Sequence, residues 1–207
     1  CVTAARRVAG ELRDLDELTA LLLRDLPFYR HSRGGVTLSG GEPTLFPRYA
    51  GELAARLSAR AVHVLLETCG HFDWGAFERH LLPHLSTVYF DLKLADDDEH
   101  RRHTGRGNAQ IRENLGRLVQ TRVVEVLPRI PLVPGITDRA TNLEALAAWL
   151  TDLDLPRVAL LPYNPLWVGK REALGMDMPY GRREWMEEGE VERCARDVRR
   201  AGLEVVG

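Results

Sequence analysis

The sequence has 207 residues, of which 44% are hydrophobic, and its 28 basic and 30 acidic residues leave a formal net charge of -2. This length and composition predict one sizeable globular domain. The near-neutral charge argues against nucleic acid as the main partner. No apolar run is long enough to cross a bilayer and no signal peptide opens the chain, so we expect a cytoplasmic protein with no membrane partner.

The helical and strand periods alternate along the chain. An apolar helical period over residues 11–26 predicts a first helix, and the first strand follows at 35–38. The next expected helices are 47–60, 74–82, 95–120 with an interruption near Gly105 and Gly107, 142–150 and 191–201, and the next expected strands are 62–67, 87–92, 123–132, 157–161 and 203–206. Such apolar strands between helices predict an α/β fold with a parallel sheet covered on both faces. Periodicity leaves open whether that sheet is a barrel or an open doubly wound sheet.

The first expected strand runs into a glycine turn, Gly40-Gly41-Glu42-Pro43. Two adjacent glycines let a ligand approach the backbone closely, and the Glu42 carboxylate can accept hydrogen bonds from an ammonium group. A plain turn between a strand and a helix is the alternative, and this segment by itself favours neither.

Charged residues close several of the expected strands, where ligands bind in both candidate architectures. They are the acids Glu67 and Asp91 and the bases Lys93 and Arg129. One interpretation is that the four neutralise one another in a polar plug. Their recurrence at successive strand ends favours a site for a ligand of mixed charge, such as an amino acid moiety. Glu42 would then hold an ammonium, and Arg129 or Lys93 a carboxylate.

Several motifs, in order, resemble those of one family, the radical S-adenosylmethionine (radical SAM) enzymes, and within it the activases of glycyl radical enzymes. The similar segments are Phe28-Tyr29-Arg30, Gly34 to Pro43, Glu67 to Gly70, Phe90 to Lys93, Thr104-Gly105 with Asn108, Arg129 to Asp138, and Leu160 to Tyr163. The resemblance covers most of the chain. It implies a partial TIM-like (β/α) barrel and a bound S-adenosylmethionine.

The resemblance also implies roles for individual residues. Gly40, Gly41 and Glu42 would meet the amino group of S-adenosylmethionine. The expected contacts to its carboxylate or ribose are Lys93 and Arg129, with Glu67 and Asp91 as polar neighbours, and Asn164 stands near the cofactor where many activases have a histidine. Pro131 and Val133 would line the adenine or substrate side, or else belong to the ordinary barrel core.

The family holds a 4Fe-4S cluster on a CxxxCxxC loop after its first barrel strand. The three cysteines here, Cys1, Cys69 and Cys194, are far apart and form no such loop. We therefore expect residues 1–207 to be a single partial-barrel domain whose first strand and cluster loop lie upstream. Cys1 would be a metal ligand of an auxiliary cluster at the end of a ferredoxin-like insertion, and this piece alone would be inactive.

For the complete protein, the resemblance implies that one electron from the reduced cluster cleaves S-adenosylmethionine to methionine and a 5'-deoxyadenosyl radical. That radical would take a hydrogen atom from a glycine of a partner glycyl radical enzyme, with a flavodoxin or ferredoxin as the reductant. Two alternatives remain open. One is a radical SAM enzyme that acts on another substrate, and the other is a non-catalytic barrel that binds S-adenosylmethionine or a partner without a cluster.

Overall fold

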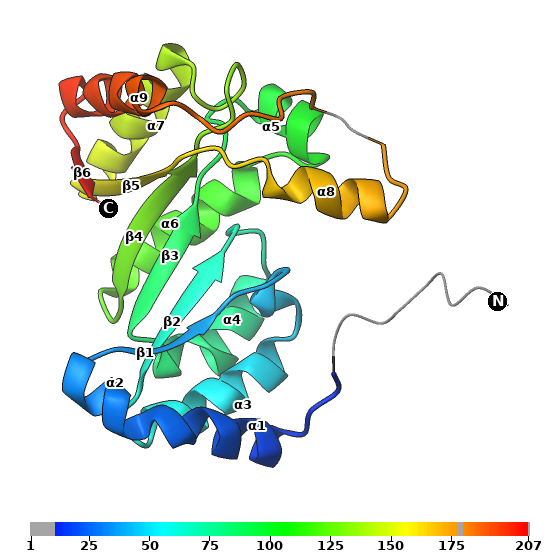
Figure 1. Ribbon diagram of the computed structural model, residues 1–207. Helices are drawn as coiled ribbons and strands as arrows, with labels where there is room; N and C mark the ends of the chain where they lie inside the picture. The colour runs from blue at the N-terminus through cyan, green and yellow to red at the C-terminus, as the bar shows by residue number, and fades with distance from the viewer. Residues whose placement is uncertain (1–10, 178–179, 207) are drawn as a thin grey trace, which may run out of the picture.

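The computed structural model describes residues 11–177 and 180–206, and Figure 1 shows the arrangement of their elements. The strands are β1 (Gly35–Leu38), β2 (His63–Thr68), β3 (Thr87–Asp91), β4 (Glu125–Pro131), β5 (Arg157–Leu161) and β6 (Glu204–Val206). The α-helices are α1 (Leu15–Leu22), α2 (Leu26–Ser32), α3 (Pro47–Ser58), α4 (Trp74–His80), α5 (Asp97–Thr104), α6 (Ala109–Thr121), α7 (Ala140–Asp152), α8 (Leu166–Ala173) and α9 (Glu188–Arg200).

The order of the strands distinguishes a barrel from a doubly wound sheet. The six strands form one sheet in the order β1-β2-β3-β4-β5-β6, and every neighbouring pair is parallel. A doubly wound sheet reverses its strand order at a switch point, whereas a barrel adds each new strand beside the last. In the described part of the chain β1 and β6 are the two edges of the sheet, so the fold is a partial (β/α) barrel, as expected.

Burial alternates along the strands, which differs from the expectation of a sheet covered on both faces. In β2, Val64 and Leu66 are fully buried while Glu67 is partly exposed. In β3, Val88 and Phe90 are likewise buried, and Asp91 is partly exposed. Because side chains alternate between the two faces of a strand, one face is packed under helices and the other carries the charged residues.

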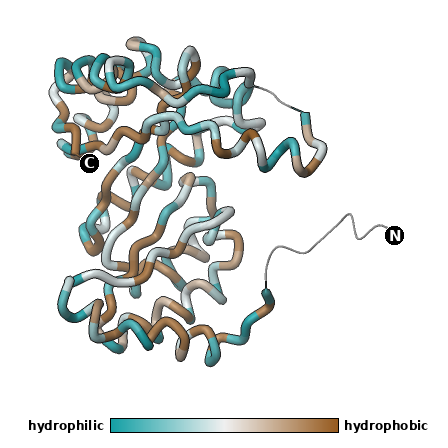
Figure 2. The backbone as a smooth tube through the Cα atoms, viewed as in Figure 1, coloured by the Kyte–Doolittle hydropathy of each residue, from teal (hydrophilic) through white to brown (hydrophobic). Residues whose placement is uncertain are grey.

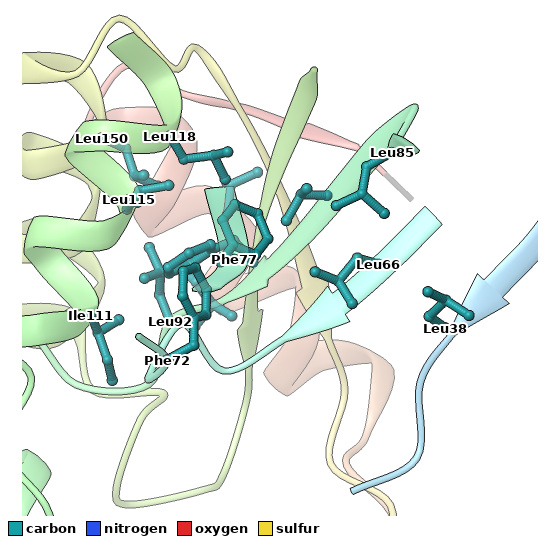
Figure 3. Packing of buried hydrophobic residues seen from close by; sticks show 14 of the residues in the cluster. Leu38, Leu66, Phe72, Phe77, Leu85, Leu92, Ile111, Leu115, Leu118 and Leu150 are labelled. Carbon is teal, nitrogen blue, oxygen red and sulfur yellow. The ribbon is translucent and has the colours of Figure 1, made fainter. Parts of the chain in front are cut away.

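The buried face packs against helices that follow the strands. Leu115 and Leu118 of α6 and Leu150 of α7 meet Phe77 of α4 and the strand side chains in one continuous core (Figure 3). The loop after β2 touches this core directly, because a Cβ atom on Gly70 would lie 2.2 Å from the ring of Phe90. Only a glycine lets this strand end come so close to the core.

The local signals explain where the helices differ from the predicted ranges. The first helix begins at Leu15 rather than at residue 11, because the side chain of Asp14 accepts hydrogen bonds from the amides of Asp16 and Glu17. It then continues as a 3-10 turn and as α2. Helix α8 was not predicted, since it buries only Val168 and so lacks a core-facing period. Helix α9 is mostly hydrophilic, as its teal colour in Figure 2 shows.

Among residues 11–177 and 180–206, no helix is both long enough and apolar enough to span a bilayer.

Candidate functional site

Arg129 brings the ends of three strands together. On β4, its Nη1 lies 2.6 Å from Oε1 of Glu67 on β2, and its Nε and Nη2 lie 3.0 and 2.9 Å from Oδ1 of Asp91 on β3. The guanidinium stacks over the ring of Tyr89, 5.0 Å from its centre. The structure therefore contains the mutual pairing of Glu67, Asp91 and Arg129 that was one interpretation of the sequence.

This pairing favours the charged forms of Arg129 and Glu67. Burial opposes the charged form of Arg129, but hydrogen bonds and charge interactions with Glu67 and Asp91 raise the pKa of the guanidinium above its usual value. Burial also opposes ionisation of Glu67, yet hydrogen bonds from Ser39 and Arg129 hold the pKa of its carboxyl below the usual range. With its N–H groups on protein carboxylates and only 12% of its side chain exposed, Arg129 is engaged inside the protein.

The same network reaches the glycine turn through Ser39. This residue lies within the family-like segment Gly34 to Pro43, but it was not predicted to belong to the site. The Ser39 hydroxyl donates to Oε2 of Glu67 over 2.6 Å. Ser39 follows β1 directly, so the chain of contacts from Ser39 through Glu67 and Arg129 to Asp91 crosses from β1 to β4.

Glu42 closes the turn onto the end of β2. Its carboxylate accepts four hydrogen bonds, from the amide and hydroxyl of Thr44, the hydroxyl of Thr68 and the amide of Cys69, at 2.7 to 3.3 Å. Burial alone would raise the pKa of Glu42, but hydrogen bonds from Cys69, Thr44 and Thr68 lower it below the usual value. The carboxylate is thus ionised, and protein donors fill most of its acceptor capacity.

Gly40 and Gly41 border open space. Gly40 has φ of +116°, which side chains other than glycine rarely adopt, and a Cβ atom added to either glycine would meet nothing within 4 Å. No donor among the residues that the structure describes reaches their carbonyl oxygens. The turn therefore offers uncovered main-chain acceptors beside an anionic cluster.

Lys93 differs from Arg129, because it makes no ion pair with any described residue. It follows β3, is partly buried, and lines a mostly apolar cavity of about 230 Å³. Another part of the lining comes from the end of β4 and the loop after it, and it includes Pro131, Val133 and Ile136, together with Tyr180. Among the described residues that line this cavity, Lys93 is the one lysine or arginine.

The remaining predicted residues lie apart from this network. Asn164 is exposed, and its Oδ1 accepts from the amide of Leu166 over 3.3 Å at the start of α8. Cys1 lies outside the described residues, so its predicted role as a metal ligand stays a prediction. Among residues 11–177 and 180–206, no three His, Cys, Asp or Glu side chains gather closely enough to hold a metal ion. The described residues thus provide no ligand set for a 4Fe-4S cluster.

A family model described as the Radical SAM superfamily matches residues 1–146. The chain therefore belongs to the radical SAM superfamily. Within that superfamily its relatives are activating enzymes, so the resemblance to activases of glycyl radical enzymes is confirmed.

Three of these relatives show how much of each chain is shared. The sequence is 36% identical over 183 residues to an isethionate sulfite-lyase activating enzyme from Oleidesulfovibrio alaskensis, covering 87% of this chain and 58% of the relative. It is 38% identical over 176 residues to an indoleacetate decarboxylase activating enzyme from Tractidigestivibacter scatoligenes, covering 84% and 55%. It is 34% identical over 169 residues to a pyruvate formate-lyase-activating enzyme from Clostridium pasteurianum, covering 81% of this chain and 70% of the relative. The chain thus spans a little over half the length of the first two.

The fold has counterparts among solved structures. A domain of a pyruvate-formate lyase-activating enzyme from Bacteroides vulgatus superimposes with a TM-score of 0.66 at 22% identity, covering 84% of this chain and 98% of that one. A radical SAM methyltransferase from Sphaerobacter thermophilus superimposes with a TM-score of 0.64 at 19% identity, covering 94% of this chain and 57% of that one. At these identities the likeness supports the partial-barrel fold alone.

Proposed function

We propose that the complete protein is a glycyl-radical-enzyme activase, and that the carboxyl ends of β1 to β4 hold its S-adenosylmethionine. The observation that carries the proposal is an uncovered glycine turn beside the cluster of Glu67, Asp91 and Arg129, together with a lysine that has no carboxylate partner among the described residues, in a chain whose relatives are activating enzymes. Bound there, S-adenosylmethionine would supply the 5'-deoxyadenosyl radical that takes a hydrogen atom from a glycine of the partner enzyme.

The charges of the site suit that cofactor. Glu42, Glu67 and Asp91 contribute three carboxylates against the two cations of Arg129 and Lys93, which leaves an excess of negative charge. S-adenosylmethionine carries a sulfonium and an ammonium against one carboxylate, so its net charge is positive. An anionic, partly buried cluster favours such a ligand over a neutral or anionic one.

Each end of the ligand would have a partner of suitable chemistry in this site. The uncovered carbonyls of Gly40 and Gly41 are acceptors for the ammonium, and the ammonium of Lys93 is a partner for the carboxylate. The apolar cavity that contains Pro131 and Val133 suits the adenine or the substrate side. Glu42 and Arg129 would act by shaping the site, because their own polar atoms already have protein partners.

The remaining components follow from the chemistry of the proposal. Cleaving S-adenosylmethionine needs one electron from a low-potential cluster, so a flavodoxin or ferredoxin is the reductant that we propose. The names of the relatives favour an activating role over a radical SAM enzyme that acts on a small molecule.

The proposal is tested on the full-length protein in two measurements. The first is calorimetric titration with S-adenosylhomocysteine of the wild type, of Lys93→Met and of Lys170→Met, which alters the chain's other lysine on exposed α8. We expect Lys93→Met to weaken binding about tenfold or more through loss of a charge-assisted contact, with Lys170→Met unchanged. Equal affinity in all three proteins would contradict the assignment of Lys93.

The second measurement addresses the reaction. After anaerobic reconstitution, iron and sulfide are assayed and 5'-deoxyadenosine is measured under reduction, alone and with a candidate glycyl radical enzyme. Formation of 5'-deoxyadenosine with a glycyl radical signal in the partner supports the activase. Formation of 5'-deoxyadenosine without that signal in any candidate partner would favour another substrate, and failure to bind a cluster would exclude the catalytic role.

A further inference from the structure

One buried amide connects the two walls of the cavity beside Lys93. Asn142 on α7 is 8% exposed, and its Oδ1 accepts from the amide of Ala95 over 2.9 Å. Its Nδ2 donates to the carbonyl of Lys93 over 3.0 Å and to the carbonyl of Thr137 over 2.9 Å. Since a donor faces the oxygen and two carbonyls face the nitrogen, these partners fix the orientation of the amide.

The segments that Asn142 joins are the segment after β3 and the loop after β4. The first provides Lys93 and Leu94 as one wall of the cavity, and the second provides the apolar wall with Val133 and Ile136. Both are loops, and a loop without such anchors would be free to move relative to its neighbour.

Other contacts hold each wall, and one ion pair, from Arg139 to Glu99 on α5, also runs between the loop after β4 and the chain that follows β3. The hydroxyl of Thr137 donates to the carbonyl of Pro131 at the end of β4 and accepts from the amide of Val133 in the loop after it. Asn108 donates to the carbonyls of Leu94 and Ala95, on the other wall. Within residues 11–177 and 180–206, Asn142 is the side chain that bonds both to residues 93–95 and to residues 132–137.

We propose that Asn142 is a positioning residue for the cofactor site, which holds the Lys93 segment at a set distance from the apolar wall. The ligand would then meet the ammonium and the apolar wall together, without first ordering either loop. The ligand side of this inference rests on the proposed binding of S-adenosylmethionine.

The test compares Asn142→Asp and Asn142→Leu with Leu150→Ala in the full-length protein. The aspartate keeps an acceptor for Ala95 but sets oxygen against the two carbonyls, and the leucine removes all three bonds. Leu150 is fully buried on the same helix and does not line the cavity, so Leu150→Ala measures loss of stability alone. Hydrogen exchange of residues 93–95 and 133–137 and calorimetric affinity for S-adenosylhomocysteine are measured for each.

We expect both Asn142 variants to speed exchange in both segments and to weaken S-adenosylhomocysteine about tenfold, while Leu150→Ala stays within about twofold of the wild-type affinity. Unchanged affinity in both Asn142 variants, or an equal loss in Leu150→Ala, overturns the positioning role. If the wild type does not bind S-adenosylhomocysteine, the proposed function fails. In that case the hydrogen-exchange data decide whether Asn142 couples the two walls. Unaltered exchange at residues 133–137 in the Asn142 variants would refute that coupling.

Discussion

Arg129 reaches from β4 across β3 to Glu67 on β2, where the guanidinium and the carboxylate are 2.6 Å apart. The guanidinium of Arg129 also stacks on the ring of Tyr89. One side chain therefore ties three adjacent strands together at the end of the sheet where we propose that the cofactor binds.

Replacing Arg129 with Met leaves Glu67 and Asp91 close together, partly buried and without their cation. We expect a loss of about 2–3 kcal/mol in the free energy of unfolding, below the ~3–5 kcal/mol typical of a fully buried pair, because both acids keep some contact with water. Urea denaturation at pH 7 measures it. The matched control is Arg157→Met on β5, whose single pair with Glu125 is exposed and should be worth no more than about 0.5 kcal/mol. Equal losses would contradict the bridging role.

Glu42→Gln should destabilise the protein at neutral pH by about 1–3 kcal/mol, because the amide nitrogen would face donors such as the amide of Cys69. The folded-state pKa of Glu42 lies below its unfolded value, so its contribution to stability is present above the unfolded value and disappears as pH falls through the folded one. Denaturation of both proteins at pH 7 and at progressively lower pH measures the difference. It should shrink on acidification, and a constant difference would be inconsistent with an ionised Glu42.

The two glycines of the turn should respond differently to alanine. Gly40→Ala forces a side chain into a positive φ and should lower the free energy of unfolding by about 1–2 kcal/mol. Gly41→Ala has no such strain and should alter stability by less than about 0.5 kcal/mol, but its methyl group enters the open space beside the carbonyls. Thermal unfolding with S-adenosylhomocysteine titration separates the two effects. Unimpaired ligand binding by Gly41→Ala would argue that the ligand lies elsewhere.

The sequence predicted the sheet well because its strands are short apolar runs bounded by turn residues. The ranges 35–38 and 157–161 agree with β1 and β5 at both ends. Prediction was poorest for α8, where Leu166 is exposed, Val168 is the one buried residue and the helix has almost no core-facing side. Periodicity reports which side chains are buried, so a helix that buries little gives no signal.

The sequence predicted which residues form the candidate site better than it predicted which of them bond to one another. Charged strand ends indicated that Glu67, Asp91 and Arg129 would meet, and they do. Local sequence could not indicate that Arg129 would be engaged by protein acids and Lys93 left open, since that depends on strand register. Asn142 gave no signal either, because its three partners lie 5 to 49 residues away in sequence.

The strictly sequential strand order has a consequence for folding during synthesis. Each strand pairs with the strand just before it, so the sheet can grow from its amino-terminal edge as the chain emerges. Glu67 and Asp91 are both made before Arg129, and they lack their cation until β4 joins the sheet. The anionic end of the sheet is therefore assembled late, and a nascent chain that stops short of β4 holds two carboxylates without their cation.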